Sequence, residues 1–376
     1  MSTFKACIVG GGFIGRAHVE ALRRLGFVQV AALCDVRGAE ETAAELHIPS
    51  TYADFEDMLM REKPDAVHIC TPNVTHFNLV KQAILHGVHV VCEKPFMMDV
   101  PEAEEIVRLA DEKGILGCLN FHNRFFPMVN HMRKAVLDGT LGALTAVYGS
   151  YFQDWLLLDT DYSWRLSRSV GGKTRTIGDI GSHFMDLAEF VTGARITSVM
   201  AQFKTQYPVR RQTADLKTYT VAGEGAKGEE VAVDTEDMAN LMLRFDNGAI
   251  GSASFSQMFA GKKNGLSIGV TGTKESSEWS LDNPETLWFG SRKGFNRTVT
   301  KEAAFADETT RALIGYPAGH MEGFPSALAN GLRSFYRGLD GHPSRIGATF
   351  ADGLHSMRLC EAAFCSAQKD VWAEVK

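Results

Sequence analysis

The stretch IVGGGFIGRAH, residues 8–18, decides the fold of the first part of the chain. It overlaps a short apolar run, residues 6–9, and leads into a segment with apolar residues at helical spacing, including Ala21 and Leu22. Between the two, Gly10, Gly12 and Gly15 have the spacing GxGxxG. A glycine-rich turn with this spacing between a strand and a helix is typical of the first unit of a doubly wound parallel sheet.

The following residues continue the alternation of apolar runs and helical segments. Four more runs are short and apolar: residues 30–33, 66–70, 88–92 and 115–119. Strands that are buried on both faces and separated by helices form a parallel sheet. One helix has a predicted start, because Asp99 and Glu102 form a capping-box pattern before an apolar stripe. We therefore expect an α/β Rossmann domain, a doubly wound parallel sheet, over residues 1–122.

The pattern changes after residue 122. Longer runs, several of them alternating, follow at residues 144–152, 196–203, 239–245, 249–255 and 266–270. Asn247-Gly248 between two of these runs is typical of a two-residue hairpin turn. We expect residues 123–376 to form an α+β domain with a large, mostly antiparallel open sheet. Within it, the polar segment 207–237 is expected to be a loop and residues 350–367 a helix.

The composition argues against several classes of protein. The net charge is −6, and Lys and Arg are scattered along the 376 residues, so we expect no nucleic-acid partner. Seven cysteines without CxxC spacing suggest buried thiols in a reducing compartment. No apolar stretch approaches the ~20 residues that cross a bilayer, and the first residues resemble a strand rather than a secretory signal. We expect a cytoplasmic protein with no membrane partner and no metal.

The glycine-rich turn also predicts a dinucleotide site. Backbone N–H groups and the dipole at the helix start favour a pyrophosphate, and Phe13 and Ile14 lie in the same turn. Asp35 follows Gly15 by 35 − 15 = 20 residues, at the end of the second predicted strand, where an acid accepts hydrogen bonds from ribose hydroxyls. The acid favours NAD over NADP, whereas Arg37 could bind the additional phosphate of NADP.

Further candidates follow the third and fourth predicted strands, because the ligand of such a sheet lies at the carboxyl ends of its strands. The third strand is followed by the cofactor candidates Thr71, Pro72, Asn73 and His76, although a helix cap explains the same pattern. The fourth ends in Glu93 and Lys94 before Pro95, which could form a cis bond. An amine at this edge could donate to a substrate oxygen. A structural salt bridge is the alternative for both charged residues.

A second constellation is GDIGSHFMDLAEFVTG, residues 178–193. Asp179 and His183 are four residues apart at the start of a helix with an apolar face. A carboxylate in this position can orient an imidazole and raise its basicity, as a general base for an alcohol proton requires. A metal site is the alternative, but no third ligand stands out.

Taken in order along the chain, these motifs resemble the Gfo/Idh/MocA family of oxidoreductases. The resemblance covers GGGFIG, CTPNVTHF, CEKP, NFHNRFFP, GDIGSH and TEDMANLMLRFDNGAIG. It implies a Rossmann domain followed by an open-sheet domain, whose exposed face commonly forms homodimers or homotetramers. It also implies that the helix at 350–367 packs back on the first domain, and that Lys94, Asp179 and His183 are catalytic.

Residues 151–165 and 316–332 are similar to family members that act on pyranoses and glycosides. Aromatic side chains could stack on a sugar ring, and polar ones could bind its hydroxyls, with core packing as the alternative for the aromatics. The candidates for these contacts are His122, Arg124, Gln153, Asp154, Trp155, Tyr162, Trp164, Arg165 and His320.

The sequence as a whole favours an NAD-dependent dehydrogenase that oxidises a secondary ring hydroxyl of a pyranose sugar or glycoside by reversible hydride transfer, with C3 as one candidate position. The rival enzyme is an inositol (cyclitol) 2-dehydrogenase, since a cyclitol offers a similar array of hydroxyls. The rival from another class is a non-catalytic regulatory protein that senses a dinucleotide and a sugar.

Overall fold

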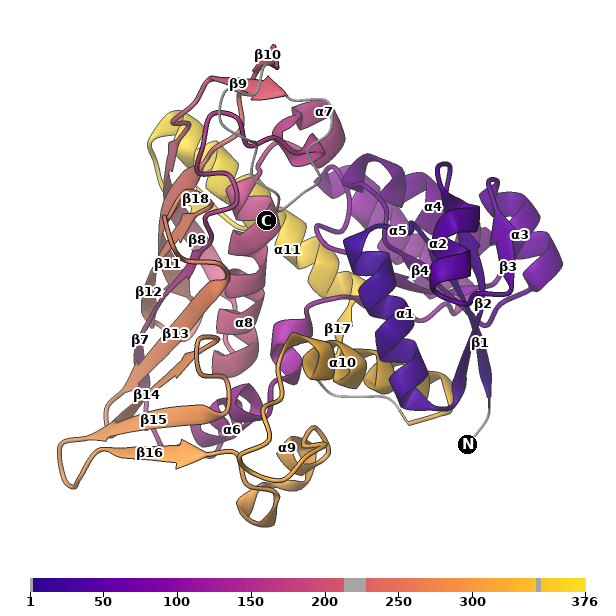
Figure 1. The fold of residues 1–376 in the computed structure, drawn as a ribbon. Coiled ribbons are helices and arrows are strands. Elements are labelled where there is room, and N and C mark those ends of the chain that lie inside the picture. Colours follow the sequence, from indigo (N-terminus) through magenta and orange to yellow (C-terminus); the bar gives the residue numbers. More distant parts are fainter. Residues whose placement is uncertain (1–2, 213–227, 343–345) are drawn as a thin grey trace. The chain divides into compact units, whose positions relative to one another are not determined.

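The computed structural model describes residues 3–212, 228–342 and 346–376 (Figure 1). The chain forms two compact units, one of Met1–Phe126 with Glu322–Met357 and one of Pro127–Met321 with Arg358–Lys376. These units differ from the expected division into 1–122 and 123–376, mainly because residues 322–357 pack with the amino-terminal segment. Apolar side chains of that late segment complete both cores of the first unit.

The first unit contains a seven-stranded sheet with the order β17-β6-β5-β4-β1-β2-β3. All neighbouring strands are parallel except β17, which is antiparallel to β6. The strands are β1 (Phe4–Val9), β2 (Val28–Cys34), β3 (Ser50–Tyr52), β4 (Ala66–Ile69), β5 (His89–Cys92), β6 (Gly117–Leu119) and β17 (Ala348–Thr349). The predicted parallel sheet is confirmed. The sequence did not indicate β3 and β17, which are too short to show a period.

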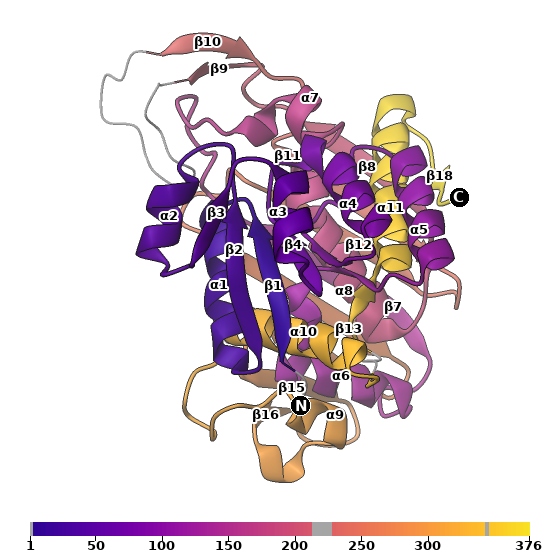
Figure 2. The same ribbon diagram turned by 90° about the vertical axis from the view of Figure 1, so that its right-hand side faces the viewer.

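Helices cover both faces of this sheet (Figures 1 and 2). Alternate residues of β1 point to opposite faces, so Ala6 and Ile8 join one core and Cys7 and Val9 the other. The first core includes side chains of α1 (Phe13–Leu25), α2 (Ala39–Glu45) and α10 (Phe324–Leu339). The second includes side chains of α3 (Phe55–Glu62), α4 (His76–Leu85), α5 (Val100–Lys113) and the first residues of α11 (Phe350–Lys369). This arrangement is doubly wound, as predicted.

The expected start of α5 is confirmed at atomic detail. The Asp99 carboxylate accepts a hydrogen bond of 3.0 Å from the Glu102 backbone N–H. The Glu102 carboxylate accepts one of 3.0 Å from the Met98 backbone N–H, one residue before the cap. Two backbone donors at the helix start are therefore satisfied by side chains.

The second unit contains a nine-stranded sheet with the order β16-β15-β14-β13-β7-β12-β11-β8-β18. All pairs are antiparallel except β7 with β12. The strands are β7 (Leu144–Phe152), β8 (Ile196–Lys204), β11 (Met238–Phe245), β12 (Ile250–Ser256), β13 (Gly265–Gly272), β14 (Glu275–Ser280), β15 (Thr286–Ser291), β16 (Arg297–Thr300) and β18 (Ala373–Glu374). The predicted hairpin joins β11 and β12, where the Phe245 N–H donates to the Ala249 carbonyl at 3.0 Å.

The helices α6 (Pro127–Leu137) and α8 (Ser182–Thr192) lie beside this sheet (Figure 1). Close packing between α8 and β7 requires a glycine, because a Cβ on Gly149 would lie 2.2 Å from the ring of Phe184. Shorter helices are α7 (Arg168–Gly171) and α9 (Glu308–Arg311).

The prediction of a loop over residues 207–237 is partly wrong. Within it, β9 (Val209–Gln212) pairs antiparallel with β10 (Glu229–Ala232) to form a separate two-stranded sheet. Residues 213–227 of the expected loop lie outside the described residues. These strands carry several charged residues instead of an apolar run. In β9, the buried guanidinium of Arg210 donates a 3.0 Å hydrogen bond to the Leu156 carbonyl.

Two general findings concern the described residues. None of the helices there is long and apolar enough to span a membrane. The cysteines are all free thiols, and five are buried, in agreement with their expected packing role.

Candidate active site

The glycine-rich turn connects β1 to α1. Gly10 has φ +97°, and a Cβ on it would lie 2.7 Å from the Cys70 carbonyl oxygen. A Cβ on Gly15 would lie 1.9 Å from the Gly10 carbonyl oxygen, so both glycines are needed for the turn itself. Gly12, the N-cap of α1, has open space around it, since a Cβ there would meet nothing within 4 Å. An uncapped helix start with free space in front of it fits the pyrophosphate of a dinucleotide.

Asp35 lies directly after β2 and faces this turn. One carboxylate oxygen accepts a 2.7 Å hydrogen bond from the Gly11 backbone N–H. The other accepts a 3.0 Å bond from the Arg37 backbone N–H. Each oxygen keeps further acceptor capacity for a ribose hydroxyl. The side chain of Arg37 is exposed. Of the other turn residues, Phe13 is 65% exposed and Ile14 is half-buried.

The residues after β4 form a short turn, in which Thr71 and Pro72 are half-buried and Asn73 is buried. The Thr75 hydroxyl donates to Thr71 Oγ1 at 2.6 Å. His76 is fully buried, with Nε2 3.0 Å from the Thr71 carbonyl and Nδ1 3.2 Å from the Phe96 carbonyl. Burial lowers the pKa of this imidazole. His76 therefore links the end of β4 to the segment after Lys94, a supporting position rather than an exposed cofactor contact.

Glu93 and Lys94 follow β5, and the Lys94–Pro95 peptide bond is cis, as the sequence suggested. Phe96 and Met97 are buried in the core, which fixes the chain just beyond the lysine. Lys94 itself is half-buried. Glu93 is 7% exposed and accepts hydrogen bonds from His18 at 3.0 Å and from Asn120. Sequence reasoning missed His18 and Asn120, since neither stands in a local motif with Glu93.

The two candidates after β6 differ in their surroundings. His122 is half-buried and meets Phe324 edge to face, with 4.9 Å between ring centroids. Burial lowers the pKa of His122 to about 4, so its ring is neutral at pH 7. Arg124 is buried, and its guanidinium lies 3.5 Å from the Asp352 carboxylate at the start of α11. This ion pair gives Arg124 a role in holding α11.

In the second unit, Asp179 lies in a π-helical turn (Ile177–Gly181) that continues directly into α8. One oxygen of its carboxylate accepts a 2.7 Å hydrogen bond from Gln257 Nε2, and the other lies 3.8 Å from Arg165 Nε. His183 is 4% exposed in the first turn of α8, with its ring centroid 6.3 Å from that of Tyr151. A donor amide and a guanidinium thus converge on the Asp179 carboxylate.

Buried acids hold this turn in place. The Glu236 carboxylate accepts hydrogen bonds from the backbone N–H groups of Arg175, at 2.9 Å, and Ile177, at 2.8 Å. Burial raises the pKa of Glu236. Asp237 pairs with Arg175 and, at 2.7 Å, with Arg210, and all three side chains are fully buried. The sequence placed Glu236 and Asp237 in the motif TEDMANLMLRFDNGAIG but gave neither residue a role.

Several candidate substrate residues are tied to neighbours. Trp155 Nε1 donates to Gln153 Oε1 at 2.8 Å, and Gln153 Nε2 donates to Asn264 at 3.1 Å. The Asp154 carboxylate pairs with Lys263 at 2.7 Å. These contacts orient the polar groups of the segment after β7.

The aromatic candidates also make apolar or stacking contacts. Trp155 and Tyr162 pack on a small apolar cluster. The Arg165 guanidinium lies over the Trp164 ring, 4.3 Å from its centroid, so the arginine that approaches Asp179 is also stacked. His320 has an exposed side chain, and its carbonyl accepts a 2.9 Å hydrogen bond from the buried Lys301.

Comparison with known proteins agrees with this fold. Residues 4–121 match the model of an oxidoreductase family with an NAD-binding Rossmann fold. Residues 129–278 match the model of the GFO/IDH/MocA C-terminal domain. The chain belongs to the Gfo/Idh/MocA family. This Gfo/Idh/MocA protein is therefore an oxidoreductase with an NAD-binding Rossmann domain, and the expected family is confirmed.

Its similar relatives include sugar dehydrogenases. The Gfo/Idh/MocA chain is 26% identical to levoglucosan dehydrogenase of Pseudarthrobacter phenanthrenivorans, over 100% of this chain and 99% of that protein. It is 26% identical to D-glucoside 3-dehydrogenase of Escherichia coli, over 66% of this chain and 69% of that protein. A crystal structure of an oxidoreductase domain protein from Kribbella flavida has a TM-score of 0.89 at 26% identity, with 100% of both chains covered.

Proposed function

We propose that this protein is an NAD-dependent dehydrogenase that oxidises a secondary ring hydroxyl of a pyranose sugar or glycoside. The observation that carries the proposal is similarity along the whole chain to a levoglucosan dehydrogenase, in a sequence with Lys94, Asp179 and His183 in the family motifs. Relatives named D-glucoside 3-dehydrogenase and glucose-6-phosphate 3-dehydrogenase support C3 as the oxidised position.

In the proposed reaction, His183 takes the proton of the substrate hydroxyl while the carbinol carbon loses a hydride and becomes a carbonyl carbon. A bound NAD would supply the acceptor for that hydride. Lys94 donates a hydrogen bond to the substrate oxygen and stabilises the negative charge that develops there. Asp179 supports the imidazole that receives the proton, and Gln257 and Arg165 orient Asp179. In the reverse direction, His183 returns the proton.

The proposed catalytic residues come from both parts of the chain: Lys94 belongs to the first unit, and Asp179 and His183 to the second. Contacts with the sugar are proposed for the aromatic and polar side chains of residues 153–165, for His122 and for His320.

NAD is the proposed cofactor. Asp35 has its carboxylate directed at the glycine-rich turn, and a fixed negative charge there would repel the 2′-phosphate of NADP. Gly10, Gly12 and Gly15 are proposed to admit the pyrophosphate, and the turn after β4 and Glu93 to line the site.

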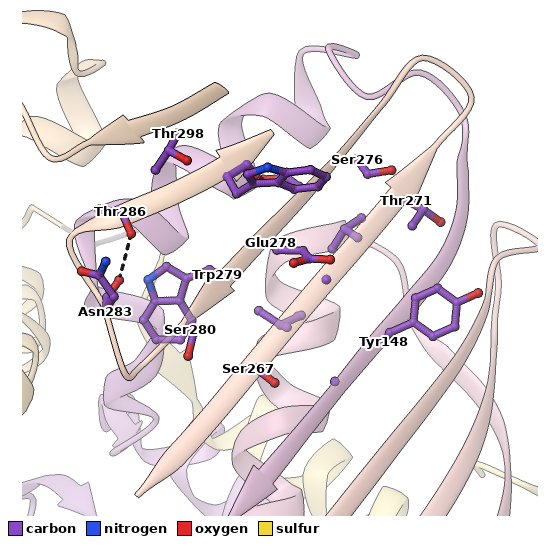
Figure 3. Close-up of a pocket in the computed structure, with 16 residues that line it drawn as sticks. Tyr148, Ser267, Thr271, Ser276, Glu278, Trp279, Ser280, Asn283, Thr286 and Thr298 are labelled. Atoms are coloured by element: carbon purple, nitrogen blue, oxygen red, sulfur yellow. Dashed lines mark hydrogen bonds between the residues drawn. The ribbon is translucent and has the colours of Figure 1, made fainter. Parts of the chain in front are cut away.

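The outer face of the nine-stranded sheet is the proposed interface between copies of the chain. A cross-strand row on this face comprises Thr298, Trp288, Glu278, Gly269, Tyr148, Ser252, Met242 and Met200. Around Gly269, which has no side chain, this face has a pocket of about 550 Å³ (Figure 3). Tyr148 and Met242 are 49% and 50% exposed, so the face offers apolar area for a homodimer or homotetramer.

A cytoplasmic location is proposed as well, from the cysteine usage of the sequence.

The function is tested by incubating the purified protein with NAD and a panel of pyranoses, glycosides and cyclitols, while the absorbance of the reduced nicotinamide is followed. We expect turnover of pyranosides, and preferred turnover of inositols would instead support the cyclitol dehydrogenase. Lys94→Met and His183→Gln should each lower kcat by orders of magnitude, while NAD still binds. The matched controls Lys81→Met, in a surface ion pair with Glu105, and His86→Gln, near Glu56, should retain activity. No turnover on any substrate, with NAD bound, would favour the regulatory alternative.

A further inference from the structure

A chain of buried polar side chains ends at Glu93. The Tyr336 hydroxyl lies 2.8 Å from His68 Nε2. His68 Nδ1 lies 2.9 Å from His18 Nδ1, and His18 Nε2 lies 3.0 Å from the Glu93 carboxylate. Tyr336, His68 and His18 are fully buried, and Glu93 is 7% exposed. The chain therefore crosses the interior of the first unit out of contact with water.

These side chains come from four different elements. His18 lies on α1, His68 on β4, Glu93 just after β5, and Tyr336 on α10. Asn120, just after β6, donates a second hydrogen bond to the same oxygen of Glu93. Tyr336 is 268 positions from His68 in the sequence, so no local motif brings them together. The contact depends on the packing of α10 against the sheet.

The hydrogen-bond direction in this chain follows from its chemistry. An ionised carboxylate can only accept, so His18 donates from Nε2 to Glu93. A neutral His18 then accepts at Nδ1, which requires His68 to donate from its own Nδ1. His68 consequently accepts at Nε2, and the Tyr336 hydroxyl is its donor. With both imidazoles neutral, only one placement of the protons gives every donor and acceptor in the chain a partner.

The charge states agree with this arrangement. Burial pushes the pKa of Glu93 up, but the hydrogen bonds from His18 and Asn120 and the charge of Lys94 outweigh it and hold the pKa below its usual value. Burial lowers the pKa of His68 well below its usual value. Burial raises the pKa of Tyr336 well above its usual value. Glu93 is thus an anion, whereas His68 and Tyr336 are neutral.

We propose that Tyr336, His68 and His18 are positioning residues: through this one-directional chain they hold Glu93 as a fixed anion that orients the adjacent Lys94. The inference rests on the proposed function, because it assigns these residues to the lysine of that reaction. The chain cannot deliver a proton to Glu93, since a shift of all its protons would leave a buried tyrosinate. Its effect is to fix a charge in place beside the catalytic amine.

Glu93 also acts on other titratable groups around it. Those that interact with its charge are His18, Cys70, His76, Cys92, Cys118 and His122. Burial raises the pKa of the thiols, to about 12 for Cys118, so they stay uncharged at neutral pH. The charge of Lys94 in turn lowers the pKa of Glu93, as expected for a cation beside an anion.

The first test is the protonation state of the two imidazoles, measured by 15N NMR of the whole protein at pH 7. We expect His68 to carry its proton on Nδ1 and His18 on Nε2. A proton on His68 Nε2 would overturn the proposed direction of the chain. This measurement does not depend on any substrate.

The second test is Tyr336→Phe, which removes only the terminal hydroxyl. Without that donor, His68 Nε2 is a buried acceptor with no partner at this end of the chain, so the imidazoles and Glu93 should be held less firmly. We expect kcat to fall about tenfold with KM for the sugar nearly unchanged, and the acid limb of the pH–rate profile to move to higher pH. Glu93→Gln should reduce kcat more strongly. Tyr52→Phe is the matched control, because its hydroxyl bonds to Glu62 in the same unit but has no link to Glu93.

The outcomes separate the two proposals. An inactive Lys94→Met together with an unchanged kcat and pH profile in folded Tyr336→Phe overturns the positioning role alone. Full activity of Lys94→Met overturns the proposed function and the positioning role with it. A lower thermal stability of Tyr336→Phe with unchanged kinetics means that the hydroxyl serves only the fold, which also overturns the proposal.

Discussion

Gln257 donates a 2.7 Å hydrogen bond from its amide to the carboxylate of Asp179. Gln257 directly follows β12 and is fully buried, so its amide cannot move away from that carboxylate into solvent. Its backbone N–H donates to the Asp237 carbonyl and its carbonyl accepts from the Leu156 N–H. Both backbone polar groups of Gln257 are therefore hydrogen-bonded, which fixes the position from which its side chain extends.

The first prediction concerns this contact. Gln257→Met keeps the volume of the side chain but removes the donor, so Asp179 loses one of its orienting partners. A hydrogen bond to a charged group contributes roughly 1.5–3 kcal/mol, so we expect kcat to fall between about tenfold and a hundredfold. Steady-state kinetics with the pyranoside that the protein turns over fastest measures this fall in kcat. Gln368→Met on the exposed end of α11 is the control, and equal kinetics in the two variants would refute the role of Gln257.

The second prediction concerns stability. Arg210 is fully buried, pairs with Asp237 at 2.7 Å, and donates to the carbonyl groups of Leu156, Leu158 and Asp161. Arg210→Met leaves these acceptors without their donor, so we expect a loss of roughly 3–5 kcal/mol of unfolding free energy. Chemical denaturation measures it. Arg211→Met is the control: it breaks an exposed pair with Asp159 and should cost less than about 1 kcal/mol. Equal losses would contradict the prediction.

The third prediction concerns cofactor choice. Asp35→Asn keeps an oxygen that accepts from the Gly11 N–H but removes the negative charge. We expect the ratio of kcat/KM for NAD to that for NADP to fall by at least about tenfold, because the repulsion of the 2′-phosphate is lost. The exposed Arg37 should then contribute to NADP binding, and the double variant with Arg37→Ala should lose part of the gain. An unchanged ratio would show that Asp35 does not select the cofactor.

The fourth prediction concerns pH. Burial lowers the pKa of His122 to about 4, so the unfolded state, with a pKa near 6.5, binds more protons than the folded state between these values. Stability should therefore fall as the pH decreases from about 6.5 to about 4. The buried His68 and His76, with their lowered pKa values, act in the same direction.

Urea unfolding at pH 7 and pH 5 measures this effect. His122→Gln should reduce the difference in unfolding free energy between the two pH values by roughly 1–2 kcal/mol. An identical pH dependence in the variant would mean that His122 is not the group responsible.

The fifth prediction concerns assembly. Tyr148→Glu with Met242→Glu places two charges in the cross-strand row on the outer face of the nine-stranded sheet. If this face joins copies of the chain, sedimentation or mass photometry should show a shift from an oligomer to a monomer. Both side chains are about half exposed in the isolated chain, so folding should be retained. An unchanged mass distribution would place the interface elsewhere.

The sequence predicted the parts of this protein that depend on local patterns. The glycine-rich turn, the alternating strands and the capping box at Asp99 each depend on residues close in the chain, and the structure has all three. The short strands β3 and β17 were missed because two or three residues show no periodicity. The strands β9 and β10 were missed because their charged residues leave no apolar run or apolar alternation in the sequence.

The same limit applies to the candidate site. Lys94, Asp179 and His183 could be proposed because they stand in recognisable motifs. Gln257, His18 and Asn120 could not, because each acts through a partner at least 27 positions away in the sequence. Their contacts follow from strand order and helix packing, which single-sequence periodicity does not determine.

The placement of α10 has a consequence for engineering. Leu328, Leu332 and Phe335 fill one core of the nucleotide-binding unit, and Phe350 of α11 fills the other. An isolated fragment ending near residue 122 would leave both sheet faces partly bare. A chimera that exchanges this unit between two relatives must therefore transplant residues 322–357 along with the amino-terminal segment, as two pieces of a single graft.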